Sequence, residues 1–133
     1  MNVKSVFFII KESIELIRKA GPGANILIIS SIGGSNPPWE GGLYGSNKAA
    51  LENMIKWLKD ELRPDGIRVN GLAPGLIKTE FSYQLWKNED PSNPDGKMGE
   101  SSEIGSVAAM ICSKDGSFVN GVTVPVHGGW PKL

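Results

Sequence analysis

Cysteine is nearly absent from this sequence, since Cys112 is the only one in 133 residues. A single cysteine excludes a disulfide framework within the chain, which is typical of an intracellular, reducing environment. Long hydrophobic runs are absent as well. Runs such as Val6–Ile10 fall far short of the about 20 residues that a membrane-spanning helix needs. The sequence therefore predicts neither a membrane span nor the apolar region of a signal peptide.

An excess of charge of either sign is also missing. The 14 Lys and Arg residues balance 14 Asp and Glu residues, which gives a formal net charge of zero. A neutral chain has no general electrostatic attraction to nucleic acid or to an anionic membrane, so neither is predicted as a partner. The single histidine, His127, has no cluster of other ligands around it in the sequence, and no metal site is predicted.

The chain does contain an alternation of helical and strand patterns. Apolar residues recur at helical spacing over residues 3–19, 44–62 and 104–111, and apolar runs predict strands at 25–30, 67–72 and 122–126. The run at Asn25–Ser30 is apolar throughout, which is typical of a strand buried on both faces of a parallel sheet. This order predicts one domain of the α/β class. We expect a partial, Rossmann-like, doubly wound parallel sheet of three strands with helices on both faces.

Smaller features refine this prediction. Pro125 indicates that the last strand lies at an edge, and Ser101 or Ser102 is expected to cap the third helix. A short helix is expected near Phe81–Trp86. Cys112 is expected to pack beside the apolar stripe of the third helix.

Tyr44 and Lys48 are four residues apart at the start of a predicted helix, so their side chains share one face. A nearby ammonium group stabilises a phenolate, which makes proton exchange with a substrate oxygen feasible. The spacing alone is a weak signal, and an exposed helix pair is the simpler interpretation. Ser31 strengthens the catalytic interpretation, because it lies 13 residues before Tyr44 at the end of a buried strand.

Together these features resemble the NAD(P)-dependent short-chain dehydrogenase/reductase family, over essentially the whole chain. The features that carry the resemblance are Ser31, Tyr44, Lys48 and the segment Asn70–Thr79. Within the family, Ala73–Ser82 followed by Leu85-Trp86 is most similar to peroxisomal, NADP-dependent carbonyl and retinal reductases. The resemblance implies NADP as the cofactor, with NAD not excluded.

The resemblance also implies individual roles. Tyr44 would be the general acid and base, and Lys48 would stabilise its phenolate and bind the nicotinamide ribose. Ser31 would orient the substrate carbonyl. Asn2 would hold a proton-relay water, although an asparagine at this position is equally well explained as a helix cap.

Further positions match the part of the family's site that holds the nicotinamide end of the cofactor. These are Pro74, Gly75, Ile77 and Thr79, besides Tyr44 and Lys48. Residues from about 81 to 98 match the substrate loop, and Trp86 is expected near substrate.

The sequence departs from the family in one respect. No glycine-rich turn between a strand and a helix lies near its start, where family members bind the cofactor pyrophosphate. We therefore expect residues 1–133 to be the C-terminal catalytic and substrate half of the domain, without the N-terminal dinucleotide-binding half. The strand at Asn25–Ser30 would then have an unpaired edge, and the chain would be inactive by itself.

The function implied is a Tyr-Lys-Ser oxidoreductase of carbonyl and alcohol substrates: ketones, aldehydes, and retinal or retinol. The alternative is a non-catalytic dimerisation fragment that pairs with intact subunits through helices 3–19 and 44–62. A homo-oligomer is expected for the full-length form. The terminal Pro131-Lys132-Leu133 resembles a peroxisomal signal, and a chance sequence there would leave the protein in the cytoplasm.

Overall fold

The computed structural model describes residues 2–37, 41–87 and 98–129. Its helices and strands follow one another in this order: α1 (Asn2–Lys19), β1 (Asn25–Ile29), η1 (Ile32–Gly34), α2 (Gly42–Glu61), η2 (Arg63–Asp65), β2 (Arg68–Pro74), α3 (Tyr83–Trp86), α4 (Ser101–Cys112) and β3 (Thr123–Val126). The short elements η1 and η2 are 3₁₀ turns. All three predicted strands and all three predicted helices are present.

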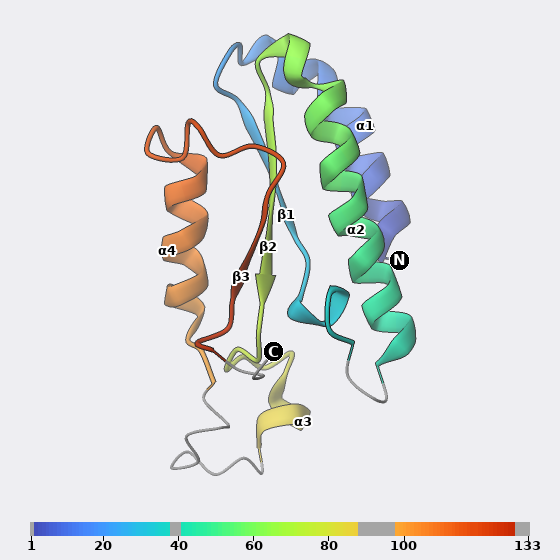
Figure 1. Cartoon of the computed structure of the whole chain (residues 1–133), viewed down its shortest axis with the longest axis vertical. Helices are drawn as coiled ribbons and strands as arrows, with labels where there is room; N and C mark the ends of the chain where they lie inside the picture. Colours follow the sequence, from blue (N-terminus) through green and yellow to red (C-terminus); the bar gives the residue numbers. More distant parts are fainter. Residues whose placement is uncertain (1, 38–40, 88–97, 130–133) are drawn as a thin grey trace.

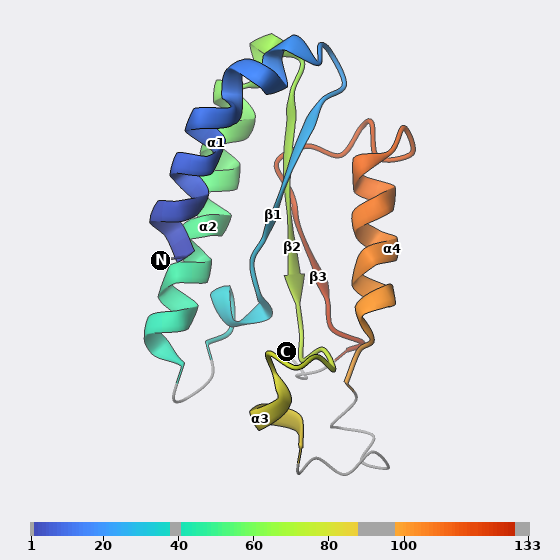
Figure 2. The same cartoon turned by 180° about the vertical axis from the view of Figure 1, so that it is seen from behind.

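The three strands form one parallel sheet in the order β1-β2-β3. Asn25 of β1 pairs with Arg68 of β2, and Gly71 of β2 pairs with Thr123 of β3. Figures 1 and 2 show α1 and α2 on one face of the sheet and α4 on the other. The predicted partial parallel sheet with helices on both faces is therefore confirmed.

The main core lies between the sheet and the helices α1 and α2. Its buried residues are Ile10, Ile26, Ile28, Leu51, Ile55, Leu58, Leu62, Ile67 and Val69. They come from the apolar stripes of both helices, from alternate positions of β1, from Val69 of β2, and from Leu62 and Ile67, which lie between α2 and β2. Burying each such side chain stabilises the fold by about 1.5–3 kcal/mol, and this packing fixes α2 against the sheet.

The face of β2 toward α4 carries buried polar residues, which the sequence pattern did not predict. The Arg68 guanidinium donates to the backbone oxygens of Ile111, at 2.9 Å, and Val119, at 3.0 Å. The Asn70 amide donates to Val119 O at 2.9 Å, and its oxygen accepts from the Val122 N–H at 3.2 Å. These bonds hold the segment between α4 and β3 against β2, and so they position β3.

Two predictions about α4 are wrong. The N-cap is Glu100 rather than Ser101 or Ser102, because Glu100 and Glu103 form a capping box in which each side chain accepts the other's backbone N–H. Cys112 is exposed instead of packed in the apolar stripe, and its thiol lies 3.4 Å from Asn25 Oδ1.

The strand limits also shift slightly from those predicted. β1 ends at Ile29 instead of Ser30, and β3 begins at Thr123 instead of Val122. β2 covers Arg68–Pro74 instead of 67–72, because Ala73 and Pro74 pair with Pro125 and Val126 of β3. Within the described residues, β1 and β3 are the two edges of the sheet, as predicted for both strands.

Candidate active site

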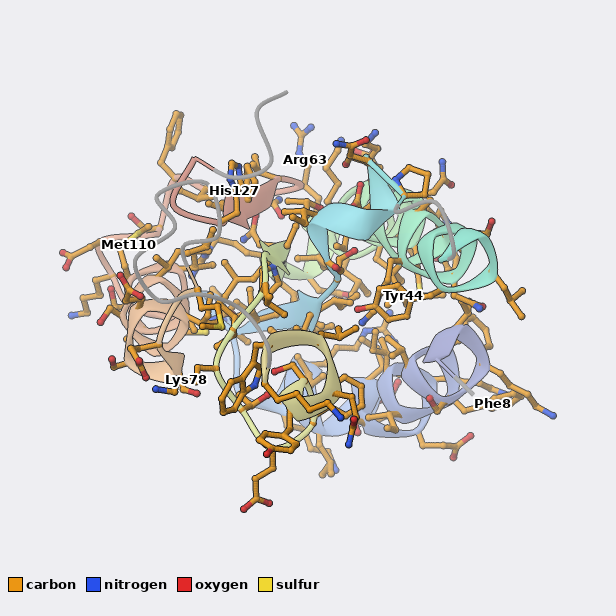
Figure 3. The ribbon with its side chains drawn as sticks, turned by 90° about the horizontal axis from the view of Figure 1, so that it is seen from below. Phe8, Tyr44, Arg63, Lys78, Met110 and His127 are labelled. Atoms are coloured by element: carbon orange, nitrogen blue, oxygen red, sulfur yellow. The ribbon has the colours of Figure 1, made fainter. Side chains whose placement is uncertain are left out.

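The predicted site residues follow the carboxyl ends of the strands. Figure 3 looks onto this end of the molecule and shows Tyr44, Lys78 and His127 around it. Ser31 comes two residues after β1 and is half-buried. Its backbone is extended, and its hydroxyl oxygen accepts the N–H of Gly33 at 3.2 Å, which caps η1. The start of η1 therefore fixes the Ser31 hydroxyl beside the sheet.

Tyr44 and Lys48 lie together on α2, as their spacing predicts. The Lys48 ammonium nitrogen is 5.6 Å from the centre of the Tyr44 ring. It also donates a hydrogen bond of 3.0 Å to the backbone oxygen of Ile29, the last residue of β1. The Tyr44 side chain is 40% exposed, so its phenol is open to an incoming molecule. The face of α2 that carries this pair thus lies against the end of β1.

Glycine allows this close approach of α2 to the strand end. A Cβ added at Gly45 would lie 2.6 Å from the backbone oxygen of Gly33, closer than real Cβ contacts. A Cβ at Gly34 would lie 3.1 Å from the backbone nitrogen of Ala49. The first turns of α2 therefore pack backbone against backbone on η1, which brings the Tyr44 and Lys48 helix next to the segment that carries Ser31.

The Glu52 carboxylate ties the same two elements together with hydrogen bonds. It accepts the hydroxyl of Ser30 at 3.0 Å and that of Ser35 at 3.1 Å. Ser30 is buried and comes directly before Ser31. These bonds hold the Ser31 segment against α2. That the Ser31 hydroxyl and the Tyr44 phenol share one substrate oxygen stays a prediction.

Pro74 and Gly75 lie at the end of β2, beside the end of β3. The Gly75 N–H donates to the backbone oxygen of Val126 at 2.9 Å. A Cβ added at Gly75 would lie 2.8 Å from the Cβ of His127, so this position accepts glycine and little else. The predicted nicotinamide segment therefore begins from a position fixed between two strands.

Ile77 and Thr79 continue this segment toward α3. Ile77 forms a parallel bridge with Gly99, which ties the segment to the residues that precede α4. The hydroxyls of Thr79 and Ser82 are 2.8 Å apart, and the indole N–H of Trp86 donates to the Thr79 backbone oxygen at 2.9 Å. The Thr79 hydroxyl is thus engaged locally, and Trp86 lies against the predicted cofactor segment.

Sequence reasoning missed Ser82, which organises this turn. Ser82 is 8% exposed, and its hydroxyl contacts the Thr79 hydroxyl and the backbone oxygen of Ile77. A second hydroxyl three residues after Thr79, just before a short helix, was the available signal.

Replacing Ser82 by alanine should lower the free energy of unfolding by about 1–2 kcal/mol, because buried partners of a lost hydroxyl are left unsatisfied. Urea unfolding followed by circular dichroism measures this. Ser106→Ala is the matched control, since the Ser106 hydroxyl bonds only along the exposed face of α4. Equal effects of the two substitutions would contradict a structural role for Ser82.

Asn2 is the first residue of α1, and its side chain lies outside the described part of the structure. Its proton-relay role stays a prediction. Part of the predicted substrate loop, residues 88–97, and the terminal Pro131-Lys132-Leu133 also lie outside the described residues.

The site residues fit one end of a nicotinamide cofactor better than the other. Tyr44, Lys48 and Thr79 supply hydroxyl and ammonium groups suited to a nicotinamide and its ribose. The N-terminus of α4 at this end suits a pyrophosphate poorly, because the carboxylates of Glu100 and Glu103 lie there and repel a phosphate from this helix start.

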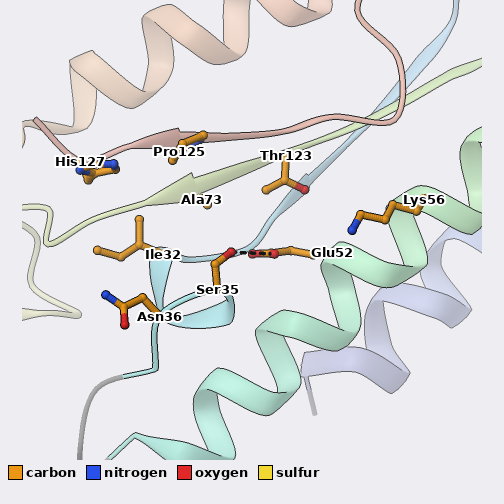
Figure 4. A pocket seen from close by; sticks show the side chains of 9 residues that line it. All are labelled: Ile32, Ser35, Asn36, Glu52, Lys56, Ala73, Thr123, Pro125 and His127. Atoms are coloured by element: carbon orange, nitrogen blue, oxygen red, sulfur yellow. Dashed lines mark hydrogen bonds between the residues drawn. The ribbon is translucent and has the colours of Figure 1, made fainter. Parts of the chain in front are cut away.

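A pocket of about 300 Å³ lies between α2, β2 and β3 (Figure 4). Its lining residues are Ile32, Ser35, Asn36, Glu52, Lys56, Ala73, Thr123, Pro125 and His127. None of the predicted catalytic or cofactor residues is among them. The pocket nevertheless adjoins the candidate site, because Ile32 follows Ser31 and the Cβ of His127 lies beside Gly75.

Across the described residues, no helix is both long enough and apolar enough to span a membrane. In the same part of the chain, no group of three or more His, Cys, Asp or Glu side chains is arranged to hold a metal ion.

Comparison with known proteins agrees with this geometry. The family model described as enoyl-(acyl carrier protein) reductase matches residues 1–131. Dehydrogenase/reductase SDR family member 4 of Homo sapiens is 38% identical over 137 residues, which cover 98% of this chain and 49% of that protein. The chain belongs to the short-chain dehydrogenase/reductase family. It spans about half the length of the curated relatives it matches.

Solved structures of the family share the fold. The 3-ketoacyl-(acyl-carrier-protein) reductase from Brucella melitensis, complexed with NADH, matches with a TM-score of 0.85 and 28% identity. The match covers 96% of this chain and 54% of that one. ElxO with NADP bound matches with a TM-score of 0.85 and 26% identity, over 99% of this chain and 56% of that one. Relatives of this short-chain dehydrogenase/reductase therefore bind nicotinamide cofactors of both kinds.

Proposed function

We propose that this chain is the catalytic and substrate-binding part of an NADP-dependent oxidoreductase of carbonyl and alcohol compounds. The observation that carries the proposal is the Tyr44 and Lys48 pair, packed against the strand end that leads to Ser31. A phenol beside an ammonium group and a neighbouring hydroxyl form a site that can exchange a proton with a substrate oxygen while supporting its charge.

Each residue has a separate task in this mechanism. The cofactor, when bound, exchanges hydride with the substrate carbon. Tyr44 passes a proton between its phenol oxygen and the substrate oxygen, and the Lys48 ammonium stabilises the phenolate that remains. Ser31 donates a hydrogen bond to the substrate oxygen and holds it toward Tyr44. Thr79 and the other strand-end residues would hold the nicotinamide end.

The finer assignments rest on similarity to dehydrogenase/reductase SDR family member 4. We propose ketones, aldehydes, and retinal or retinol as the substrate class, and NADP in preference to NAD. Residues 1–133 correspond in this proposal to the C-terminal half of the family's domain. The terminal Pro131-Lys132-Leu133 supports a peroxisomal location.

A chimera tests whether this chain carries the chemistry. The 133 residues replace the matched region of the human relative, which supplies the rest of that protein. The chimera should reduce an aromatic ketone with NADPH, and Tyr44→Phe should lower kcat at least about 100-fold, because general acid–base groups contribute that much or more.

The control is Ser106→Ala, which removes a hydroxyl on the exposed face of α4 that has no proposed role in the site. It should keep kcat within about threefold, since exposed substitutions change little. Equal turnover by the Tyr44→Phe and Ser106→Ala chimeras would overturn the assignment of Tyr44. A folded chimera that never oxidises NADPH would count against the oxidoreductase proposal.

The second candidate function, non-catalytic pairing through α1 and α2, has one favouring observation. Phe7 and Phe8 of α1 and Trp57 of α2 are 37%, 43% and 49% exposed, and the rings of Phe7 and Trp57 stack 6.4 Å apart. Exposed aromatic rings that adjoin one another are typical of association surfaces.

Sedimentation velocity should show self-association that Trp57→Glu reduces. A chain that stays monomeric at high concentration would contradict this second candidate function.

A further inference from the structure

The pocket between α2, β2 and β3 has an apolar side, which the sheet supplies. Thr123, Pro125 and His127 are alternate residues of β3 and the segment just after it, so their side chains line the pocket together. Ala73 of β2 pairs with Pro125, and with Ile32 these residues make the apolar surface. At about 300 Å³, the pocket is at the lower end of the range for small-molecule sites. It therefore suits a small ligand with an apolar part.

The helix side of the pocket carries a carboxylate and an ammonium group. Glu52 and Lys56 are four residues apart on α2, a spacing at which glutamate and lysine often pair. Within the residues that the structure describes, the two form no ion pair. The Glu52 carboxylate accepts the hydroxyls of Ser30 and Ser35 instead, and Figure 4 shows the bond from Ser35. The pocket therefore has one negative and one positive group on neighbouring turns of one helix.

These polar groups keep hydrogen-bonding capacity that is not used. A carboxylate can accept about four hydrogen bonds, and Glu52 accepts one at each oxygen. Its Oε1 packs against Gly34, where an added Cβ would lie only 2.6 Å away, so Oε2 is the more open oxygen. The Lys56 ammonium and the Thr123 hydroxyl have no hydrogen-bond partner among the described residues. A ligand can therefore bind all three groups without displacing an existing bond.

The two charges restrict the kind of ligand. An anion that binds Lys56 would be repelled by Glu52, and a cation that binds Glu52 would be repelled by Lys56. A zwitterion satisfies both, because its ammonium can donate to Glu52 while its carboxylate accepts from Lys56 and Thr123. Its apolar part is then left for the sheet side of the pocket.

We propose that this pocket binds a small zwitterion with an apolar side chain, of the class of the apolar α-amino acids. In such a molecule the opposite charges lie on adjacent carbons. That short separation matches two side chains whose Cβ atoms are about 5–6 Å apart, as at this spacing on a helix. The site does not depend on the proposed function, because none of the predicted catalytic or cofactor residues lines the pocket.

Three related probes test the charge pattern: L-phenylalanine, 3-phenylpropanoate and 2-phenylethylamine. They share the phenyl group and its chain, but the second lacks the ammonium and the third lacks the carboxylate. Titration of the 133-residue chain, followed by its amide resonances in NMR, should show saturable phenylalanine binding with a Kd of about 1 mM or below. Resonances of Glu52 and Thr123 should shift. Each single-charge probe should bind at least about fivefold more weakly, and equal binding by either one would overturn the zwitterion.

Variants test the two charged residues. Lys56→Met and Glu52→Gln should each weaken phenylalanine binding at least about fivefold, because each removes one charge. The matched controls are Lys4→Met and Glu12→Gln, at exposed positions of α1, and they should stay within about twofold.

Two outcomes would overturn the site itself: equal binding by the pocket variants and their controls, or no saturation by phenylalanine up to about 10 mM. Lys56 is exposed, so Lys56→Met keeps the test decisive even where Glu52→Gln unfolds the chain. No step of the titration uses NADPH or a carbonyl substrate. Failure of this proposal is therefore distinct from failure of the oxidoreductase proposal, which the chimera tests.

Discussion

Replacing Ile55 by alanine is expected to lower the free energy of unfolding by about 2–5 kcal/mol. Ile55 is fully buried at the middle of the contact between α2 and the sheet. Its Cδ1 atom fills the space above Gly71 of β2, where an added Cβ would lie only 2.5 Å away. The backbone on both sides is held by the sheet and by helix packing, so the cavity left by alanine cannot collapse fully.

Urea unfolding followed by circular dichroism checks this expectation. Leu43→Ala is the matched control, because Leu43 lies on the same helix and is 82% exposed. It should change the free energy of unfolding by less than about 0.5 kcal/mol. Since whole domains are stable by about 5–15 kcal/mol, the Ile55 variant is expected to be partly unfolded near 37 °C. Similar values for the two variants would show that α2 does not pack on the sheet as described.

The fold was predictable because its determinants are local. Helical stripes such as the one that includes Ile55, and apolar runs such as Asn25–Ser30, report which face of each element is buried. The alternation of such segments leaves few topologies for a parallel sheet. The cap of α4 was missed because serine is the commoner cap, while Glu100 depends on the partner Glu103.

The polar contacts across the sheet were not predictable in the same way. Arg68 and Asn70 occupy positions that the pattern assigns to a buried strand face, and their partners lie about 40 to 50 residues further along the chain. Only the folded arrangement shows which backbone oxygens need a donor there. A local pattern cannot specify such pairs, because loop closure has to bring the partners together first.

In the candidate site, too, contacts set by local spacing were predictable and contacts set by the folded arrangement were not. The pairing of Tyr44 with Lys48 follows from helical spacing, and the structure confirms it. The hydrogen bond from Lys48 to the Ile29 oxygen could not be predicted, because it depends on which strand edge is open. Ser82 was missed for a similar reason, since its importance comes from burial in a turn with no periodic pattern.

The chain purified alone should show no measurable NADPH-dependent reduction of a carbonyl compound. Hydride transfer needs the nicotinamide held in near-attack geometry beside the substrate. Tyr44, Lys48 and Thr79 supply polar groups that suit only the nicotinamide end of the cofactor. The N-terminus of α4 carries two carboxylates, which repel a phosphate there. The predicted site residues thus offer few contacts to the rest of the cofactor.

The free energies of cofactor binding support the same expectation. Three or four polar contacts contribute roughly 1 kcal/mol each, net of their bonds to water. Association removes about 4 kcal/mol or more of translational and rotational freedom, so these contacts leave no useful affinity. Fluorescence titration should therefore show no saturation by NADPH up to about 1 mM, a concentration that corresponds to only about 4 kcal/mol of binding free energy. The positive control is the chimera with the human relative, assayed with the same aromatic ketone. Micromolar binding by the isolated chain, with turnover that Tyr44→Phe abolishes, would show that the 133 residues form a working enzyme without a second half.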